Sequence, residues 1–175
     1  MKHLLTNPPL NERKGFVFVT FPFILLQQTL IIMATLQSAA NKLEVLRWTE
    51  ELCRCLELQY KNYSLRSAMN NQAMSGATDK YLQERINKIE NDEECIKFTI
   101  SSGKTYFKII QNDYRNGKYE SAGVHAFVRK DTGEVYKPAS WKAPAKHVRF
   151  DMRDQNQREY MYAHCDWAGG YLYMR

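Results

Sequence analysis

Apolar positions along the chain first recur with a helical period. From Ser38 onward, side chains suited to a buried helix face return every three or four residues: Val45, Trp48, Leu52, Cys55/Leu56 and Gln59/Tyr60. Charged residues fill the positions between them, which is the pattern of an amphipathic helix with one face in a core. We expect this helix to end at Gly76, because glycine readily adopts the left-handed conformation that closes a helix.

A second helix is predicted directly after this glycine. Thr78 is the expected N-terminal cap, with Asp79 in the first turn. The expected buried face consists of Tyr81/Leu82, Arg85/Ile86 and Ile89. The acidic run 90–94, interrupted only by an asparagine, is expected to end the helix.

Beyond residue 95 the apolar period becomes two, as in strands that are buried on one face. The expected strands are 96–100, 106–110, an alternating strand at 124–129 that a hairpin would extend back to Tyr119, one that begins at 135–136 and is stopped by Pro138, and 147–150. Turn residues at 101–103, 116–117 and 131–133 separate them. Residues 139–146 are expected to form an irregular loop, 154–164 a short helix, and the residues after Gly169 and Gly170 a final strand. The fold class is therefore α+β: N-terminal helices, then an antiparallel β-sheet of four to five strands with a short C-terminal helix, in one domain over residues 34–175.

Residues 1–33 form an apolar leader that does not share these patterns. The run from Phe16 to Ile32 is apolar apart from two threonines and two glutamines. Three interpretations stay open: a targeting signal, a buried strand at Phe16–Thr20, or a segment outside the folded domain with Met33 as the working start. The run is short for a bilayer-spanning helix and contains Pro22, so no membrane association is expected.

Charge is distributed unevenly along the chain. Residues 104–175 contain 13 basic and 8 acidic residues, a net charge of +5 out of +6 for the whole chain. Such an excess favours anionic partners, although scattered charges also serve solubility. The four cysteines, Cys53, Cys55, Cys95 and Cys165, have no CxxC spacing, and we expect four reduced, mostly buried thiols.

The segment 134–150 (EVYKPASWKAPAKHVRF) is the strongest candidate for a binding site. It interleaves cations with aromatic rings and contains only one acid. Cations bind phosphates, and an exposed aromatic ring can stack on a base. The predicted ligand-binding residues are Tyr136, Lys137, Trp141, Lys142, Lys146, His147 and Arg149. The alternative is that Trp141 fills the core from its loop while the lysines are simply solvated.

Evidence for catalysis is weaker. His125, His147 and His164 could supply an acid and a base for phosphodiester cleavage, but single histidines more often have structural partners. Residues 164–166 (HCD) are adjacent and cannot converge on one atom. The sequence contains no nucleophile elbow, phosphate loop or dinucleotide motif. We therefore predict no catalytic residue, no metal and no cofactor.

Residues 123–175 contain three distinctive sequence motifs: VHAFV, DTGEVYKPASWKAPAK and DWAGGYLY. Over this range the chain resembles uncharacterised small proteins encoded by tailed bacteriophages. The resemblance assigns no reaction. It implies the cytoplasm of an infected bacterial host as the location.

The favoured function is a phage accessory protein that binds an anionic ligand, either nucleic acid or a nucleotide, without catalysis. One alternative is a protein-interaction module, either a virion component or an inhibitor of a host enzyme, with the helical half as its contact surface. A phosphodiesterase or nuclease is the third. The oligomeric state is not predicted.

Overall fold

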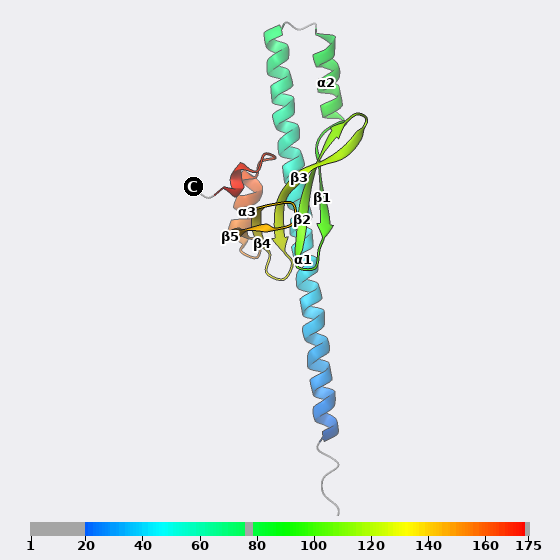
Figure 1. Ribbon diagram of the computed structural model, residues 1–175, viewed down its shortest axis with the longest axis vertical. Helices are drawn as coiled ribbons and strands as arrows, with labels where there is room; N and C mark the ends of the chain where they lie inside the picture. Colours follow the sequence, from blue (N-terminus) through cyan, green and yellow to red (C-terminus); the bar gives the residue numbers. More distant parts are fainter. Residues whose placement is uncertain (1–19, 76–78, 174–175) are drawn as a thin grey trace, which may run out of the picture. The chain divides into compact units, whose positions relative to one another are not determined.

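The computed structural model describes residues 20–75 and 79–173. The chain divides into two compact units between Gln37 and Ser38. The elements are helices α1 (Thr20–Ser75) and α2 (Lys80–Glu90), strands β1 (Lys97–Ser102), β2 (Tyr106–Arg115), β3 (Lys118–Arg129), β4 (Glu134–Pro138) and β5 (Pro144–Asp151), helix α3 (Gln155–His164) and the 3₁₀ turn η1 (Gly170–Leu172) (Figure 1). This arrangement confirms the predicted α+β class.

The part of α1 that belongs to the second unit buries one face, as its periodicity predicts. Val45, Thr49, Leu52 and Leu56 are each at most 2% exposed. The Thr49 hydroxyl donates a hydrogen bond to the carbonyl oxygen of Val45 at 2.7 Å, so this buried polar group has a partner. The helix is described up to Ser75, and the predicted end at Gly76 lies outside the described residues.

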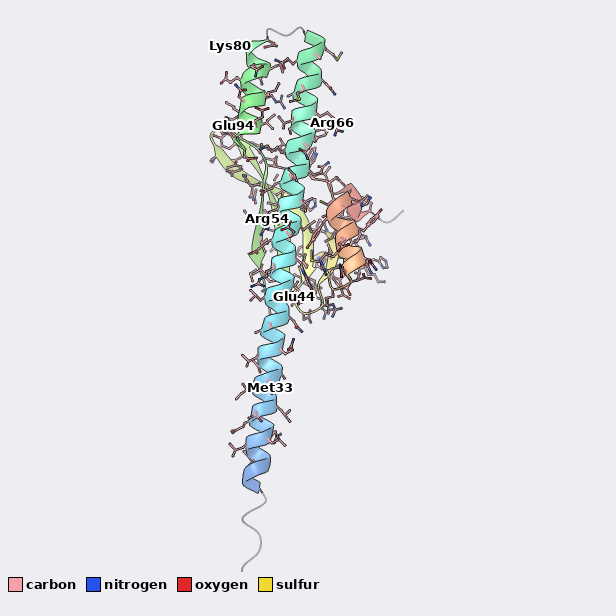
Figure 2. The ribbon with its side chains drawn as sticks, turned by 180° about the vertical axis from the view of Figure 1, so that it is seen from behind. Met33, Glu44, Arg54, Arg66, Lys80 and Glu94 are labelled. Carbon is pink, nitrogen blue, oxygen red and sulfur yellow. The ribbon has the colours of Figure 1, made fainter. Side chains whose placement is uncertain are left out.

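Helix α2 lies beside the C-terminal part of α1. Figure 2 labels Arg66 on α1 and Lys80 at the start of α2, and the Lys61 ammonium donates to the carbonyl oxygen of Glu90 at 2.9 Å. The N-cap is Asp79, whose carboxylate accepts the backbone N–H groups of residues 81 and 82. The prediction of Thr78 as the cap, with Asp79 in the first turn, was therefore wrong by one residue. Leu82, Ile86 and Ile89 are buried as predicted, but Tyr81 is 68% exposed.

The five strands form an antiparallel meander in the order β1-β2-β3-β4-β5. Asn116 and Gly117 have positive φ values of 52° and 80° in the β2–β3 turn, as a tight hairpin requires. Two expectations were wrong. Strand β5 begins at Pro144, inside the predicted loop, and the segment after Gly169 is a 3₁₀ turn. It does not extend as a strand because the Asp166 carboxylate binds the N–H groups of residues 170 and 171 at 3.0 Å.

Helices α1 and α3 cover the same face of the sheet. In Figure 2 these helices lie in front of the strands. The Tyr162 hydroxyl on α3 donates to the carbonyl oxygen of Trp48 on α1 at 2.9 Å. The core between the helices and the sheet contains Leu52, Ile109 and Met161, each 0% exposed. Among the described elements no helix covers the opposite face of the sheet (Figure 1), so that face is available to position a site.

In the first unit, the described residues belong to the N-terminal part of α1. Its larger apolar side chains between Ile24 and Leu36 are each 51% or more exposed. In the described part of the chain, no helix is long and apolar enough to cross a membrane. The buried-strand interpretation concerned residues 16–20: helix α1 begins at Thr20, and residues 16–19 lie outside the described ones.

Candidate functional site

The sheet face opposite the helices carries an aromatic cluster. Side chains alternate along a strand, so Phe107 and Ile109 enter the core while Tyr106 and Lys108 turn to the other face. The ring of Tyr106 contacts Phe127 and Tyr136 edge to face, with centroids 6.0 and 5.9 Å apart. These residues come from three neighbouring strands, and they form the floor of a candidate site.

Trp141 stands at the edge of this floor. It is 47% exposed and does not belong to the hydrophobic core. The Lys108 ammonium lies 5.3 Å from the centroid of the Trp141 ring and 5.8 Å from that of Phe127, within the range of a cation–π interaction. The interpretation of Trp141 as a core plug therefore does not fit, since the ring keeps a large solvent-exposed surface.

Short-range hydrogen bonds hold the loop that carries Trp141. The backbone N–H groups of Ala139 and Ser140 both donate to the carbonyl oxygen of Ala143, at 3.0 and 3.1 Å. The N–H of Lys142 donates to the Ser140 hydroxyl at 3.3 Å. Pro138 and Pro144 pair at the base of the loop. The loop therefore presents Trp141 in a defined position before any ligand arrives.

The other predicted site residues do not all join this face. Tyr136 is 9% exposed, and its hydroxyl donates to a Glu134 carboxylate oxygen at 2.8 Å, so it belongs to the floor and offers no free ring. Lys137 and Arg149 turn toward the C-terminal segment: the Lys137 ammonium lies 3.5 Å from the centroid of Tyr173, and Arg149 Nε donates to the carbonyl oxygen of residue 172 at 2.6 Å.

Lys142, Lys146 and His147 are exposed. Lys142 directly follows Trp141, whereas Lys146 and His147 lie on β5. The structure therefore brings Trp141 together with one residue that the sequence analysis missed, Lys108, while Lys142 is the neighbour of Trp141 along the chain. The alternation of β2 could have indicated Lys108, because it lies between the buried apolar positions 107 and 109 and therefore faces away from the core.

Ion pairs leave an excess of unpaired cations in the sheet half. In the described range 104–173, five acids form ion pairs with four cations. The remaining three acids, Asp154, Glu159 and Asp166, accept hydrogen bonds from neighbouring N–H groups. Eight cations of the same range have no ion pair: Lys104, Lys108, Lys130, Lys137, Lys142, Lys146, Arg149 and Arg158. Such an excess attracts anions to this surface.

The three histidines considered for catalysis lie in different environments. His125 is buried, with Nε2 3.0 Å from the Tyr171 hydroxyl, and this burial lowers the pKa of its imidazole to about 4. His164 is exposed and stacks on Tyr160 at 4.0 Å between centroids. His147 is exposed on β5. No cluster of three or more metal-ligating side chains occurs among the described residues.

These features define the class of the protein: an α+β domain in which two helices back one face of an antiparallel sheet and an aromatic, basic surface occupies the other. The chain belongs to the family of unknown function DUF7717, whose model matches residues 31–174. No curated protein and no solved structure matches the chain.

Proposed function

We propose that the protein binds an anionic ligand that carries a stackable ring, a nucleotide either free or within single-stranded nucleic acid. The proposed site comprises Trp141, Lys108 and Lys142, referred to below as the Trp141 platform. No catalytic step is part of the proposal. The resemblance to phage-encoded proteins supports an accessory role in the cytoplasm of an infected bacterium.

The observation that carries this proposal is the environment of Trp141. Its ring is nearly half exposed, and an ammonium group lies 5.3 Å from its centroid. A base can stack on the exposed surface while the neighbouring ammonium groups contact a phosphate. The self-bonded loop further supports binding, because a preordered site loses less conformational entropy when the ligand arrives.

The test is fluorescence anisotropy with a labelled single-stranded oligonucleotide of about ten bases, a length within the site sizes of such proteins. Trp141→Ala is expected to weaken binding by about 1–3 kcal/mol, the usual contribution of one stacked base. Lys108→Ala or Lys142→Ala is expected to flatten the dependence of log K on log salt by about 0.7 for each phosphate that the variant no longer neutralises.

Lys80→Ala is the matched control, because Lys80 is exposed on α2 and has no ion pair among the described residues. It should leave both affinity and salt slope unchanged. Competition with free mononucleotides distinguishes a nucleotide site from a strand-binding site. Equal affinity of the parent protein and the Trp141→Ala variant for every nucleotide probe would refute the proposal.

A protein-interaction module is the second candidate, and one observation favours it. The apolar side chains between Ile24 and Leu36 on α1 are exposed, and contiguous apolar surface of this kind commonly marks a contact with another protein. A stoichiometric complex that persists at high salt would support this candidate. A purely salt-sensitive association would instead support the nucleic-acid proposal.

A further inference from the structure

A hollow that is separate from the Trp141 platform lies on the opposite side of β4, next to the C-terminal segment. Its volume is about 260 Å³, and its lining includes Gln111, Gly123, His125, Lys137, Gly169 and Tyr173. A water molecule in the liquid occupies about 30 Å³, so the hollow can accommodate a small polar ligand. No aspartate or glutamate lines it.

His125 reaches this hollow because of an irregularity in strand β3. Ile109 pairs with Ala126 and Ile110 pairs with Val124, so His125 is an extra residue in the ladder. Such a bulge redirects a side chain. The imidazole is 7% exposed and contacts the ring of Phe98 with centroids 5.1 Å apart.

The contacts of His125 indicate which of its nitrogens carries the proton. Nε2 lies 3.0 Å from the hydroxyl oxygen of Tyr171. That hydroxyl has no other hydrogen-bond partner among the described residues, so Nε2 is the acceptor that the structure offers to its proton. We therefore assign the Tyr171 O–H as the donor to Nε2, which leaves the proton of the neutral imidazole on Nδ1. The lowered pKa of His125 agrees with a neutral ring.

The Nδ1–H group is open to the hollow. Nδ1 has no hydrogen-bond partner among the described residues, yet no fully buried side-chain nitrogen or oxygen of the described chain is left unpaired. Nδ1 must therefore keep access to open space, and His125 lines this hollow. Gly169, at φ 80°, lies against this side of the ring, where a Cβ atom would stand 4.0 Å from Nδ1.

Lys137 supplies a positive charge in the same hollow. Its ammonium lies 3.5 Å from the centroid of Tyr173, another lining residue, and it has no ion pair among the described residues. The acid that acts on His125 is Asp166, and both of its carboxylate oxygens accept backbone N–H groups at 3.0 Å. Among the described residues, the hollow thus combines an ammonium and a buried N–H donor without an aspartate or glutamate in its lining.

We propose that this hollow binds a small oxyanion, a phosphate or carboxylate group, between Lys137 Nζ and His125 Nδ1–H. Both groups donate hydrogen bonds, and the bond from an ammonium to an oxyanion is charge-assisted and correspondingly strong. The proposal does not depend on the Trp141 platform, because adjacent residues Tyr136 and Lys137 project to opposite faces of β4.

The experiment is a titration of the full chain followed by the imidazole nitrogen resonances. Before any ligand is added, we expect His125 at neutral pH to show the tautomer that is protonated at Nδ1. Inorganic phosphate and acetate are then added separately, up to about 10 mM, where a site with a Kd of about 1 mM would be nearly saturated. A saturable shift of the His125 Nδ1 resonance with either anion supports the proposal and identifies which oxyanion is preferred.

Chloride at the same ionic strength controls for screening. A His125 shift that chloride reproduces, or no saturable shift with either anion, would overturn the proposal. Lys137→Gln keeps the polar stem and is expected to weaken anion binding roughly tenfold, which corresponds to about 1.4 kcal/mol. Lys80→Gln is the matched control, because Lys80 is exposed on α2 and has no ion pair among the described residues. It should bind the anion as the parent does; equal binding by Lys137→Gln and Lys80→Gln would refute the role of Lys137.

The two proposed sites can fail separately. Trp141→Ala should lose oligonucleotide affinity but keep the saturable shift of His125. Lys137→Gln should need roughly tenfold more anion for the same His125 shift and should keep stacking on Trp141. Loss of the His125 shift in Trp141→Ala would show that the two surfaces form one site and would contradict the independent hollow.

Discussion

Trp141 and Tyr136 lie five residues apart and have opposite environments. Tyr136 packs edge to face on Tyr106 and donates its hydroxyl proton to Glu134. Trp141 has its ring nearly half exposed, with the Lys108 ammonium as its neighbour. The difference determines what each ring can do, since only an accessible ring can stack on a ligand.

Removal of the Trp141 ring should therefore affect binding far more than folding. We expect Trp141→Ala to change the midpoint of thermal unfolding only slightly, because the ring is nearly half exposed and does not belong to the hydrophobic core. The comparison is Trp48→Ala, which removes a ring that packs against the core and lies 4.6 Å from the Arg158 guanidinium carbon. Calorimetry should show the larger decrease for Trp48→Ala. The reverse order would indicate that Trp141 supports the fold.

Burial of His125 predicts a pH dependence of stability. The pKa of its imidazole is lowered to about 4, mainly because burial disfavours the charged form, while the charge of Asp166 acts in the opposite direction. An unfolded histidine has a pKa of about 6.5, so the unfolded chain binds an extra proton between these values. The free energy of unfolding should fall by about 2 kcal/mol between pH 7 and pH 5 through this residue alone.

Urea titrations at both pH values measure this effect. We expect the decrease to persist in His164→Gln, because His164 is exposed, and to shrink in His125→Gln. A parent protein with the same unfolding free energy at pH 7 and pH 5 would contradict a neutral, buried His125. The prediction concerns stability only, and it holds whether or not the hollow binds an anion.

The cysteines offer a test at the same scale. All four are free, as the sequence predicts; three are buried and Cys55 is half-buried. Burial raises the pKa of Cys53 and of Cys165 to about 12, so little thiolate is present at neutral pH. A thiol reagent without reductant should modify the native protein slowly and count four thiols in denaturant. A count of two or fewer would reveal a disulfide.

At the scale of elements, the alternation of side chains and the turn residues predict most of the sheet. Asn116–Gly117 and Gly133 mark turns at positive φ, as the structure has them. The start of β5 was missed because Pro144 lies in a segment without alternation. The sequence also did not predict that the candidate site residues separate onto different surfaces. Val135 pairs with Phe150 and Tyr136 pairs with Val148, so Arg149 is an extra residue in the ladder between β4 and β5. No sequence pattern marks this register shift.

Helix α3 provides the test of an element. Its N-cap is Asp154, whose carboxylate accepts the backbone N–H groups of residues 156 and 157 at 2.9 and 3.3 Å. We expect Asp154→Ala to lower the free energy of unfolding by about 1 kcal/mol, within a range of roughly 0.5–2. Asp154→Asn keeps a capping oxygen and should lose much less. Equal losses in the two variants would indicate that the charge, and not the cap, matters.

At the scale of the whole molecule, the two faces of the sheet differ: helices pack on one, and the aromatic floor beside Trp141 lies on the other. Helices α1 and α3 bury one sheet face, and eight cations of the described range 104–173 have no ion pair. The two proposed sites use opposite sides of β4. Both rest on the same excess of positive charge, which raises the local concentration of anions near either site.

The N-terminal part of α1 keeps its apolar side chains outside the core. Hydrophobic stabilisation grows with the apolar surface removed from water. The apolar side chains from Ile24 to Leu36 are each 51% or more exposed, whereas the fully buried positions of α1 begin at Val45. The second compact unit begins at Ser38, and the family match begins at residue 31. The described leader residues therefore contribute little to the core.

We therefore expect a chain that begins at Met33 to unfold at nearly the same temperature as the full chain, with a single cooperative transition. Differential scanning calorimetry of both chains makes the comparison. A chain that begins at Leu56 is the contrasting variant: it lacks Val45, Thr49 and Leu52, each at most 2% exposed, and should lose the transition. Loss of cooperative melting in the Met33 chain would instead show that the leader makes contacts on which the fold depends.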